Sequence, residues 1–418
     1  MSVTSRRHFL AGATTIGFSI GVAGCTPAPR AHASPPKRTL TDFGAIPDGT
    51  FDPATRKASG SDNTAAINAA LTMGDPVLIP PGTFYYSGLL HTDVNGSGLV
   101  GSGNRISYLI TDQSRDRHLA VVQGTRNTKW VNFGMIGPFA FDRDDFNRAI
   151  TVGLDAARTG LAANAWDASG TWINEVQTYG YTVGLHVAHA DNVRFGTIEV
   201  YEAGDSRAEP GSYGITCSGS GLKGRLLRAQ NTSTRARHAL YYTGPANDCF
   251  IDTVEATGFD FAPIRNRATA GGGQRNGFGW ARLEDCNTNS IVEPGVVRGL
   301  VDFVCSNDDP VPGAGGARIG DYIARNCSGM PGPSLRYMPN SKCGTVSVYD
   351  HKGDPDSARY GAHIFRSDSV GLPLLLLPAS SDPGVLSSSA VGPVHVEESQ
   401  DCYGGGTGHL PPGAPEGG

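Results

Sequence analysis

Side chains that could bind a substrate or catalyse a reaction are concentrated between Lys223 and Arg282. This segment holds nine arginine and lysine side chains against four carboxylates, a local charge of +5 in a chain whose formal net charge is -5. Because arginine can grip a carboxylate with two parallel hydrogen bonds, the segment indicates a site for a polyanion such as a uronic-acid polymer. The acidic overall balance argues against nucleic acid as a partner. The alternative is a solvated face of ordinary ion pairs.

His238 is the candidate general base of this segment, because imidazole titrates close to neutral pH. Its neighbours Arg237 and Tyr241 are candidate catalytic residues, and Tyr242 is an alternative partner. Alternation with Leu240 would turn His238 inward as a core histidine, unless a corner resets the phase between them. The nearby acids are candidate catalytic carboxylates: Glu255, Asp260, Glu284 and Asp285.

A second set of residues is suited to binding sugar rings. Four segments align so that Leu185, Ile215 and Leu240 take the same inward place. The alignment predicts that four other side chains point outward on successive rungs, about 4.8 Å apart: His186, Thr216, Tyr241 and Trp280. Residues 263–276 are interpreted as a 14-residue insertion that arches over this strip. The arginines expected to bind substrate there are Arg235, Arg265, Arg267 and Arg275.

These residues favour a polysaccharide or oligosaccharide as the partner and leave three activities open. In a lyase, an arginine neutralises a uronate carboxylate, a base removes the neighbouring carbon-bound proton and an acid protonates the leaving oxygen. A glycoside hydrolase needs two carboxylates about 5 to 9.5 Å apart, which Glu255 with Glu284 or Asp285 could supply. The third is a surface protein that binds without turnover. The basic segment favours the lyase. No cofactor is required, no cysteine spacing indicates a metal site, and calcium stays open.

The elements that must position these residues form a repeat. Alternating apolar segments recur, and matching positions in them lie 28, 28, 41, 27 and 24 residues apart. They begin at Asp191, Gly219, Asn247, Thr288, Ala317 and Lys342. Strand patterns that recur every 20 to 50 residues indicate a solenoid, here an all-β, single-stranded parallel β-helix. A sandwich of β-hairpins is the alternative, but two-residue Asn-Gly turns are nearly absent.

One short helix is expected before these strands, over residues 62–71. Its apolar stripe of Ala66, Ile67, Ala70 and Leu71 would cover the unpaired edge at the start of the stack. The surrounding sequence, "DFGAIPDG…DNTAAINAAL…VLIPPGTFYYSG", resembles the N-terminal signature of the pectate-lyase-like superfamily, which includes proteins related to glycoside hydrolase family 28 and phage tailspikes.

That resemblance implies a right-handed β-helix and a carbohydrate-active protein. It does not indicate which reaction the protein catalyses, because the signature contains no catalytic residues. The "NTD", "DD", "GHG" and "RIK" set of polygalacturonases is missing, although Asp144-Asp145 and Asp308-Asp309 occur. The "WIDH" and "RxPxxR" patterns of pectate lyases and the "DPHD" motif of alginate epimerases are missing as well.

The first residues are typical of an export signal. Arg6 and Arg7 followed by Phe9 match a twin-arginine signal, and "VAGC" resembles a lipobox that would make Cys25 the lipid-modified residue. The apolar run is too short and glycine-rich for a spanning helix. We therefore expect an exported protein, anchored by its lipid at the cell surface or periplasmic side of a membrane. The expected organisation is signal 1–25, linker 26–38, β-helix 39–400 and disordered tail 401–418.

The substitution Cys25→Ala is expected to release the protein from the membrane in soluble form, because the lipid on Cys25 is the predicted anchor. Fractionation of cells into membrane and soluble protein measures the effect. Retention of the variant in the membrane fraction at the level of the unsubstituted protein would contradict the lipobox.

Overall fold

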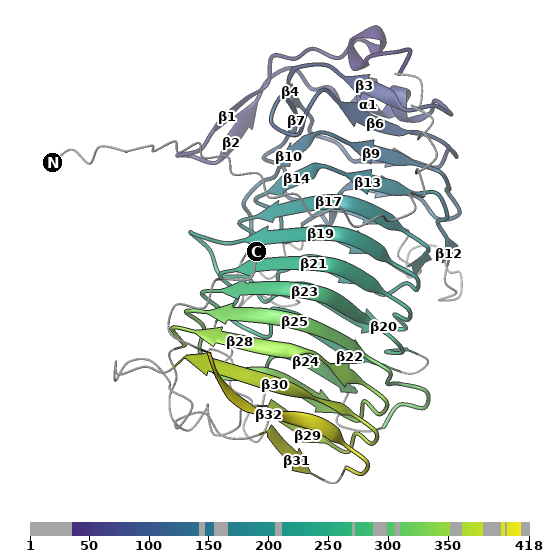
Figure 1. The fold of residues 1–418 in the computed structure, drawn as a ribbon. Helices are drawn as coiled ribbons and strands as arrows, with labels where there is room; N and C mark the ends of the chain where they lie inside the picture. Colours follow the sequence, from purple (N-terminus) through teal and green to yellow (C-terminus); the bar gives the residue numbers. More distant parts are fainter. Residues whose placement is uncertain are drawn as a thin grey trace, which may run out of the picture. The chain divides into compact units, whose positions relative to one another are not determined.

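The computed structural model describes residues 36–141, 147–153, 166–204, 211–269, 272–286, 299–305, 310–351, 362–378, 394–397 and 399–410. The predicted signal, Cys25, and the pairs Asp144-Asp145 and Asp308-Asp309 lie outside these residues. Two parallel sheets, which we call the major and the minor sheet, dominate the described part (Figure 1). No helix in that part has the length and apolar character needed to cross a membrane.

The major sheet contains 17 of the described strands, all paired in parallel. They are β3 (Val77–Ile79), β4 (Gly82–Tyr85), β6 (Gly98–Gly101), β7 (Ser107–Ile110), β9 (Lys129–Val131), β10 (Gly134–Ile136), β13 (Trp172–Asn174), β14 (Val176–Tyr179), β17 (Arg194–Tyr201), β19 (Lys223–Gln230), β21 (Phe250–Thr257), β23 (Gly277–Glu284), β25 (Arg318–Arg325), β27 (Lys342–Cys343), β28 (Thr345–Tyr349), β30 (Gly371–Pro378) and β32 (Tyr403–Leu410).

The minor sheet contains 11 of the described strands, also parallel. They are β5 (Leu90–Thr92), β8 (Arg117–Val121), β11 (Arg148–Val152), β15 (Val183–Val187), β18 (Tyr213–Cys217), β20 (His238–Gly244), β22 (Ile264–Ala268), β24 (Gly299–Cys305), β26 (Met330–Arg336), β29 (Ala362–Phe365) and β31 (Val394–Glu397). Two short pairs complete the strands: β1 (Thr50–Asp52) with β2 (Lys57–Ser59), and β12 (Trp166–Asp167) with β16 (Ala190–Asp191).

The chain passes repeatedly from the major to the minor sheet and back, so each turn adds one rung. From β17 to β23, every major-sheet strand is followed by a minor-sheet strand, and each pairs with the strand one turn later. Alternate side chains point into the space between the sheets and form one core, which includes Leu240, Ile251 and Phe278. The predicted right-handed parallel β-helix is confirmed.

The rung lengths correct the predicted insertion. Paired positions run Thr197, Leu226, Thr253, Trp280 and Asp321, so the steps are 29, 27, 27 and 41 residues. The long step therefore follows Trp280. The described residues 263–269 and 272–276 contain β22 and belong to the regular 27-residue step between β21 and β23, so they are not an extra arch over the strip. The prediction was wrong because it counted this strand as extra length.

The predicted cap is confirmed. Helix α1 runs from Thr64 to Leu71 and packs on β5 and on the 3₁₀ helix η1 (Leu40–Phe43). It begins where the Asp62 carboxylate accepts hydrogen bonds from the backbone N–H and the hydroxyl of Thr64. Its residues Ile67, Ala70 and Leu71 are fully buried, so the helix covers the start of the stack.

The C-terminal boundary of the β-helix was placed too early. Residues 401–418 were predicted to be a disordered tail, but Tyr403–Leu410 form β32, which pairs in parallel with β30. The stack therefore extends at least ten residues further than expected. The described cysteines are all unpaired thiols, and most of them fill the core as small apolar side chains.

The substitution Ile67→Ala is expected to destabilise the first rungs by about 2 to 5 kcal/mol, because it leaves a cavity beneath the cap. In a stack where each rung contacts its neighbours, the loss should stay local. Amide hydrogen exchange should accelerate at β3 and change little at β23. The control is Ala69→Ser, on the exposed side of α1. Equal acceleration in both strands would contradict a local capping role.

Candidate functional site

The outer face of the minor sheet carries a single row of polar and aromatic residues. The core residues Leu185, Ile215, Leu240 and Ile264 pair along the sheet, so the residue after each points to the opposite face. We call this set the outer row, and it runs in register through Thr151, His186, Thr216, Tyr241, Arg265, Asp302, Ser334, His363 and His395. The predicted alignment of His186, Thr216 and Tyr241 is confirmed.

An irregularity at the start of β20 turns His238 to the same side as Tyr241. The backbone N–H groups of Arg237 and His238 both donate to the carbonyl of Ser212. The next two N–H groups likewise share the carbonyl of Pro263. This doubled pairing resets the period-two phase, as a bulge does. Of the two orientations left open by the sequence, the reset of phase describes His238, which is nevertheless buried and hydrogen-bonded.

Four rings meet at this point and form what we call the ring cluster: Tyr213, His238, Tyr241 and Phe261. The imidazole centroid of His238 lies 5.6 Å from that of Tyr213, 5.0 Å from that of Tyr241 and 5.0 Å from that of Phe261. The two tyrosine rings stack with centroids 5.3 Å apart. Such spacings are those of favourable aromatic contacts, so the cluster is a rigid platform.

Two guanidinium groups flank the ring cluster. Arg237 and Arg265 place their Cζ atoms 4.9 Å and 5.1 Å from the centroid of Phe261. Both distances are within the range of cation–π attraction. Arg265 is only 8% exposed and its Nε lies 3.4 Å from Oδ2 of Asp302, a carboxylate with no exposed surface. Positive charge is therefore held beside the rings on a face that carries little water.

The burial of each side chain determines whether it can contact a substrate. Arg237 and Tyr241 are half-buried and reach the surface, whereas His238 is 1% exposed. Nδ1 of His238 donates to the Ala262 carbonyl at 2.6 Å, which leaves the lone pair of a neutral ring on Nε2. Burial raises the pKa of Tyr213 to about 12, although the charge of Arg237 opposes the shift. Tyr213 therefore stays a neutral phenol at the base of the cluster.

The candidate carboxylates Glu255 and Glu284 lie elsewhere, on the major sheet. Glu255 accepts from Nε of Arg228 at 2.6 Å, and Arg228 also donates to Glu199. Along the rungs the order is Glu199, Arg228, Glu255, Arg282, with Glu284 accepting from Arg282. This alternation of charge is an ion-pair ladder. Glu255 and Glu284 are therefore each engaged by an arginine of the major sheet, away from the ring cluster.

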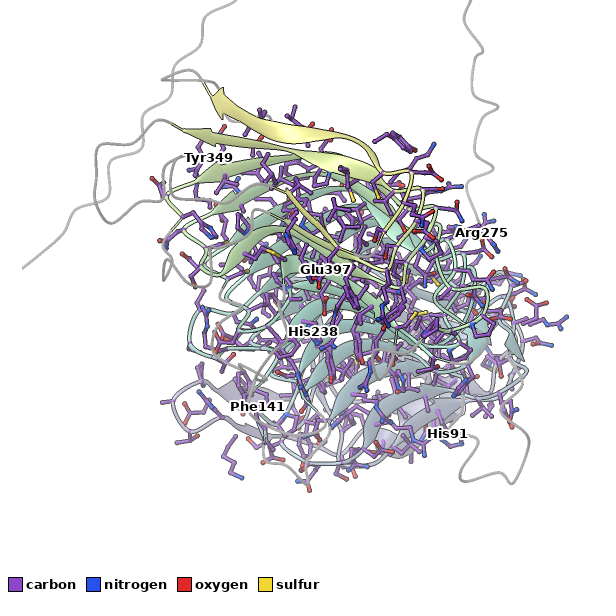
Figure 2. The ribbon with its side chains drawn as sticks, turned by 90° about the horizontal axis from the view of Figure 1, so that it is seen from below. His91, Phe141, His238, Arg275, Tyr349 and Glu397 are labelled. Carbon is purple, nitrogen blue, oxygen red and sulfur yellow. The ribbon has the colours of Figure 1, made fainter. Side chains whose placement is uncertain are left out.

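Other predicted residues occupy turns. Arg235 donates to Asp260 and to the carbonyl oxygen of Asp285, so these three form one structural unit. Arg275 holds both carboxylate oxygens of Asp248, each at 2.6 Å, and Figure 2 shows it well away from His238. The ion-pair alternative is correct for these arginines.

Three more expectations are settled by position. Trp280 lies on β23 of the major sheet and not beside Tyr241. The outer-row position next to Tyr241, which was predicted for Trp280, is occupied by Arg265. Tyr242 points inward and donates to the carbonyl of Gly277, so it is not a partner for a substrate. Arg267 is exposed two residues after Arg265, on the same face.

Three residues of the site were not predicted from the sequence: Tyr213, Phe261 and Asp302. Asp302 could have been identified from the sequence, because it is the one charged residue in the apolar strand "GLVDFVC". A buried charge needs a partner. Tyr213 stands just before the aligned segment that begins at Gly214. Phe261 lies between two strands, and nothing in its local sequence indicates that it meets two arginines.

Comparison with known proteins identifies the fold. No family model and no curated protein matches the chain. Among solved structures, the surface protein and adhesin PfbA of Streptococcus pneumoniae is 10% identical over 88% of this chain and 99% of that one, with a TM-score of 0.51.

Two enzymes match less closely in structure. The DFA-IIIase from Arthrobacter chlorophenolicus A6, solved with GF2, is 13% identical over 86% of this chain and 98% of that one, with a TM-score of 0.49. The catalytic unit of a GH87 alpha-1,3-glucanase from Streptomyces thermodiastaticus strain HF3-3 is 14% identical over 90% and 70%, with a TM-score of 0.43. At these identities a structural match shows the β-helix fold alone. Membership of glycoside hydrolase family 28 or of the pectate lyases is not shown.

The substitution Asp302→Ala is expected to destabilise the fold by about 3 to 5 kcal/mol, because it removes a buried carboxylate that faces the buried Arg265 guanidinium. The double variant Arg265→Leu/Asp302→Leu should lose less, since it removes both charges. Urea unfolding midpoints measure the difference. A double variant less stable than Asp302→Ala would show that the pair is not the dominant interaction at this position.

Proposed function

We propose that this protein is a carbohydrate-active enzyme that binds an acidic polysaccharide or oligosaccharide on the ring cluster and cleaves it by β-elimination. The observation that carries the proposal is that the two half-buried members of this site, Arg237 and Tyr241, belong to the same cluster, Arg237 over the ring of Phe261 and Tyr241 against the rings of Tyr213 and His238. Arg237 supplies a cation and Tyr241 supplies a phenol, and both contact the other rings of the cluster. The N-terminal signature supports a carbohydrate substrate by resemblance.

Binding would use the ring of Tyr241, the half-buried member of the cluster, and the cations around it. A sugar ring presents C–H groups that pack on an aromatic surface, and its carboxylate needs a charged donor. Arg237 is half-buried beside Tyr241, and Arg267 is exposed one rung later. Since rungs lie about 4.8 Å apart, Tyr241 and the exposed Arg267 are close enough for one oligosaccharide to reach both.

The chemistry follows from the groups at the surface. Arg237 neutralises the carboxylate on C5 of a uronate, which makes the C5 proton removable. Tyr241 acts as its phenolate and takes that proton, the electron pair of the C5–H bond forms the C4=C5 double bond, and the C4–O4 bond breaks with its electron pair on O4. The leaving O4 receives a proton, which the phenol can return, so no water is consumed. His238 is a positioning residue in this account, because it is buried behind the ring of Tyr241.

The acids of the minor sheet favour elimination over hydrolysis. Within the described strands of that sheet, Asp302 and Glu397 are the carboxylates. Three pairing steps separate their strands, which corresponds to about 14 Å at the usual spacing. This exceeds the roughly 9.5 Å that an inverting hydrolase spans. Asp302 is also engaged with Arg265.

The decisive experiment incubates the full chain with a panel of acidic and neutral polysaccharides. Elimination creates an unsaturated sugar, so ultraviolet absorbance should rise together with new reducing ends. Reducing ends without absorbance would establish hydrolysis instead. Retained binding with neither product would establish a surface protein that binds saccharide. Export and the lipid anchor on Cys25 belong to the same proposal, since they would place the protein where polysaccharides occur.

Arg237→Ala is expected to weaken an acidic substrate about tenfold or more, because a charge-assisted contact contributes roughly 1.5 to 3 kcal/mol. The matched control is Arg225→Ala, an exposed arginine of the same basic segment on the major sheet. Initial rates of the ultraviolet assay measure both variants. Equal losses in the two variants, or none in either, would place the substrate elsewhere.

A further inference from the structure

The far end of the outer row brings together two histidines and a glutamate. His363 of β29 pairs in register with His395 of β31, and their rings stack with centroids 5.5 Å apart. Glu397 follows His395 by two residues, so it points to the same face. The three side chains converge because the β-ladder holds His363 on β29 against His395 and Glu397 on β31, the edge strand of the minor sheet (Figure 2 labels Glu397).

The separations of their donor atoms fit a shared cation. Oε2 of Glu397 lies 3.4 Å from Nε2 of His363 and 3.5 Å from Nε2 of His395. Charge-assisted hydrogen bonds are typically shorter, about 2.7 to 2.9 Å. Ligand atoms about 2.0 to 2.1 Å from a tetrahedral Zn²⁺ lie about 3.3 to 3.4 Å from one another. All three donor atoms lie within 4.8 Å of one another.

We propose that His363, His395 and Glu397 form a binding site for a divalent transition-metal ion such as Zn²⁺. Transition-metal ions such as Zn²⁺ bind well to imidazole nitrogens together with a carboxylate, whereas calcium and magnesium prefer oxygen ligands alone. The His363 side chain is 10% exposed, whereas those of His395 and Glu397 are 36% and 48% exposed. The ion would therefore enter from solvent and keep at least one coordination position open to it.

The position of the site indicates what the ion would do. Five pairing steps separate Tyr241 from His395, or about 24 Å along the outer row, so the ion would not touch the proposed reacting atoms. It would link β31 to β29 at the open edge of the minor sheet. This inference does not depend on the proposed function, and it adds a metal-dependent clamp to the last rungs.

The test uses the full chain without an affinity tag and Zn²⁺ alone as the probe. Isothermal titration should give one ion per chain, and Zn²⁺ should raise the melting temperature. Co²⁺ should give the visible absorption bands of a low-coordinate N/O site. The variants His395→Asn and Glu397→Gln are each expected to weaken Zn²⁺ binding at least about tenfold while circular dichroism stays unchanged.

The matched control is His91→Asn, an exposed histidine in register with the opposite end of the outer row. It should bind Zn²⁺ like the unsubstituted chain. Two outcomes would overturn the proposal. One is undiminished binding by His395→Asn and Glu397→Gln. The other is binding lost only on Cys343→Ser or Cys402→Ser, which would assign the ion to the partly exposed thiols.

Discussion

The whole structure depends on parallel strands stacking in register, one rung about 4.8 Å above the next. This pairing satisfies the backbone hydrogen bonds of every inner rung and forces side chains at equivalent positions to lie directly over each other. Apolar positions then merge into one core, as Leu185, Ile215, Leu240 and Ile264 do. Because the edges of such a stack are unpaired, its start needs the cover that α1 provides.

The same stacking decides how charge is used. On the major sheet, Glu199, Arg228, Glu255 and Arg282 alternate in sign from rung to rung, so the face neutralises itself. On the minor sheet the outer row has no such alternation. There Arg265 is held between the ring cluster and a buried Asp302, and Arg237 reaches the surface beside Tyr241. Among the described residues, Arg237 and Arg265 set beside the aromatic cluster distinguish the minor sheet from the ion-pair ladder of the major sheet.

Much of the fold could be predicted, because a period of two within strands and a nearly constant rung length are both visible in the sequence. The register of His186, Thr216 and Tyr241 followed from that period alone. The sequence was not decisive where the period breaks. Doubled hydrogen bonding at His238 resets the phase without a local sequence signal. Because β22 was interpreted as a loop, Trp280 was wrongly assigned to the site. Asp302 was overlooked, since its role depends on Arg265, which lies one rung away.

The most direct test of the central claim, that the minor sheet binds the saccharide, is a crystal structure of the protein with an acidic oligosaccharide. The account predicts a sugar carboxylate within hydrogen-bonding distance of Arg237 and a sugar ring against Tyr241. An oligosaccharide bound along the ion-pair ladder of the major sheet, with the ring cluster uncontacted, would contradict it.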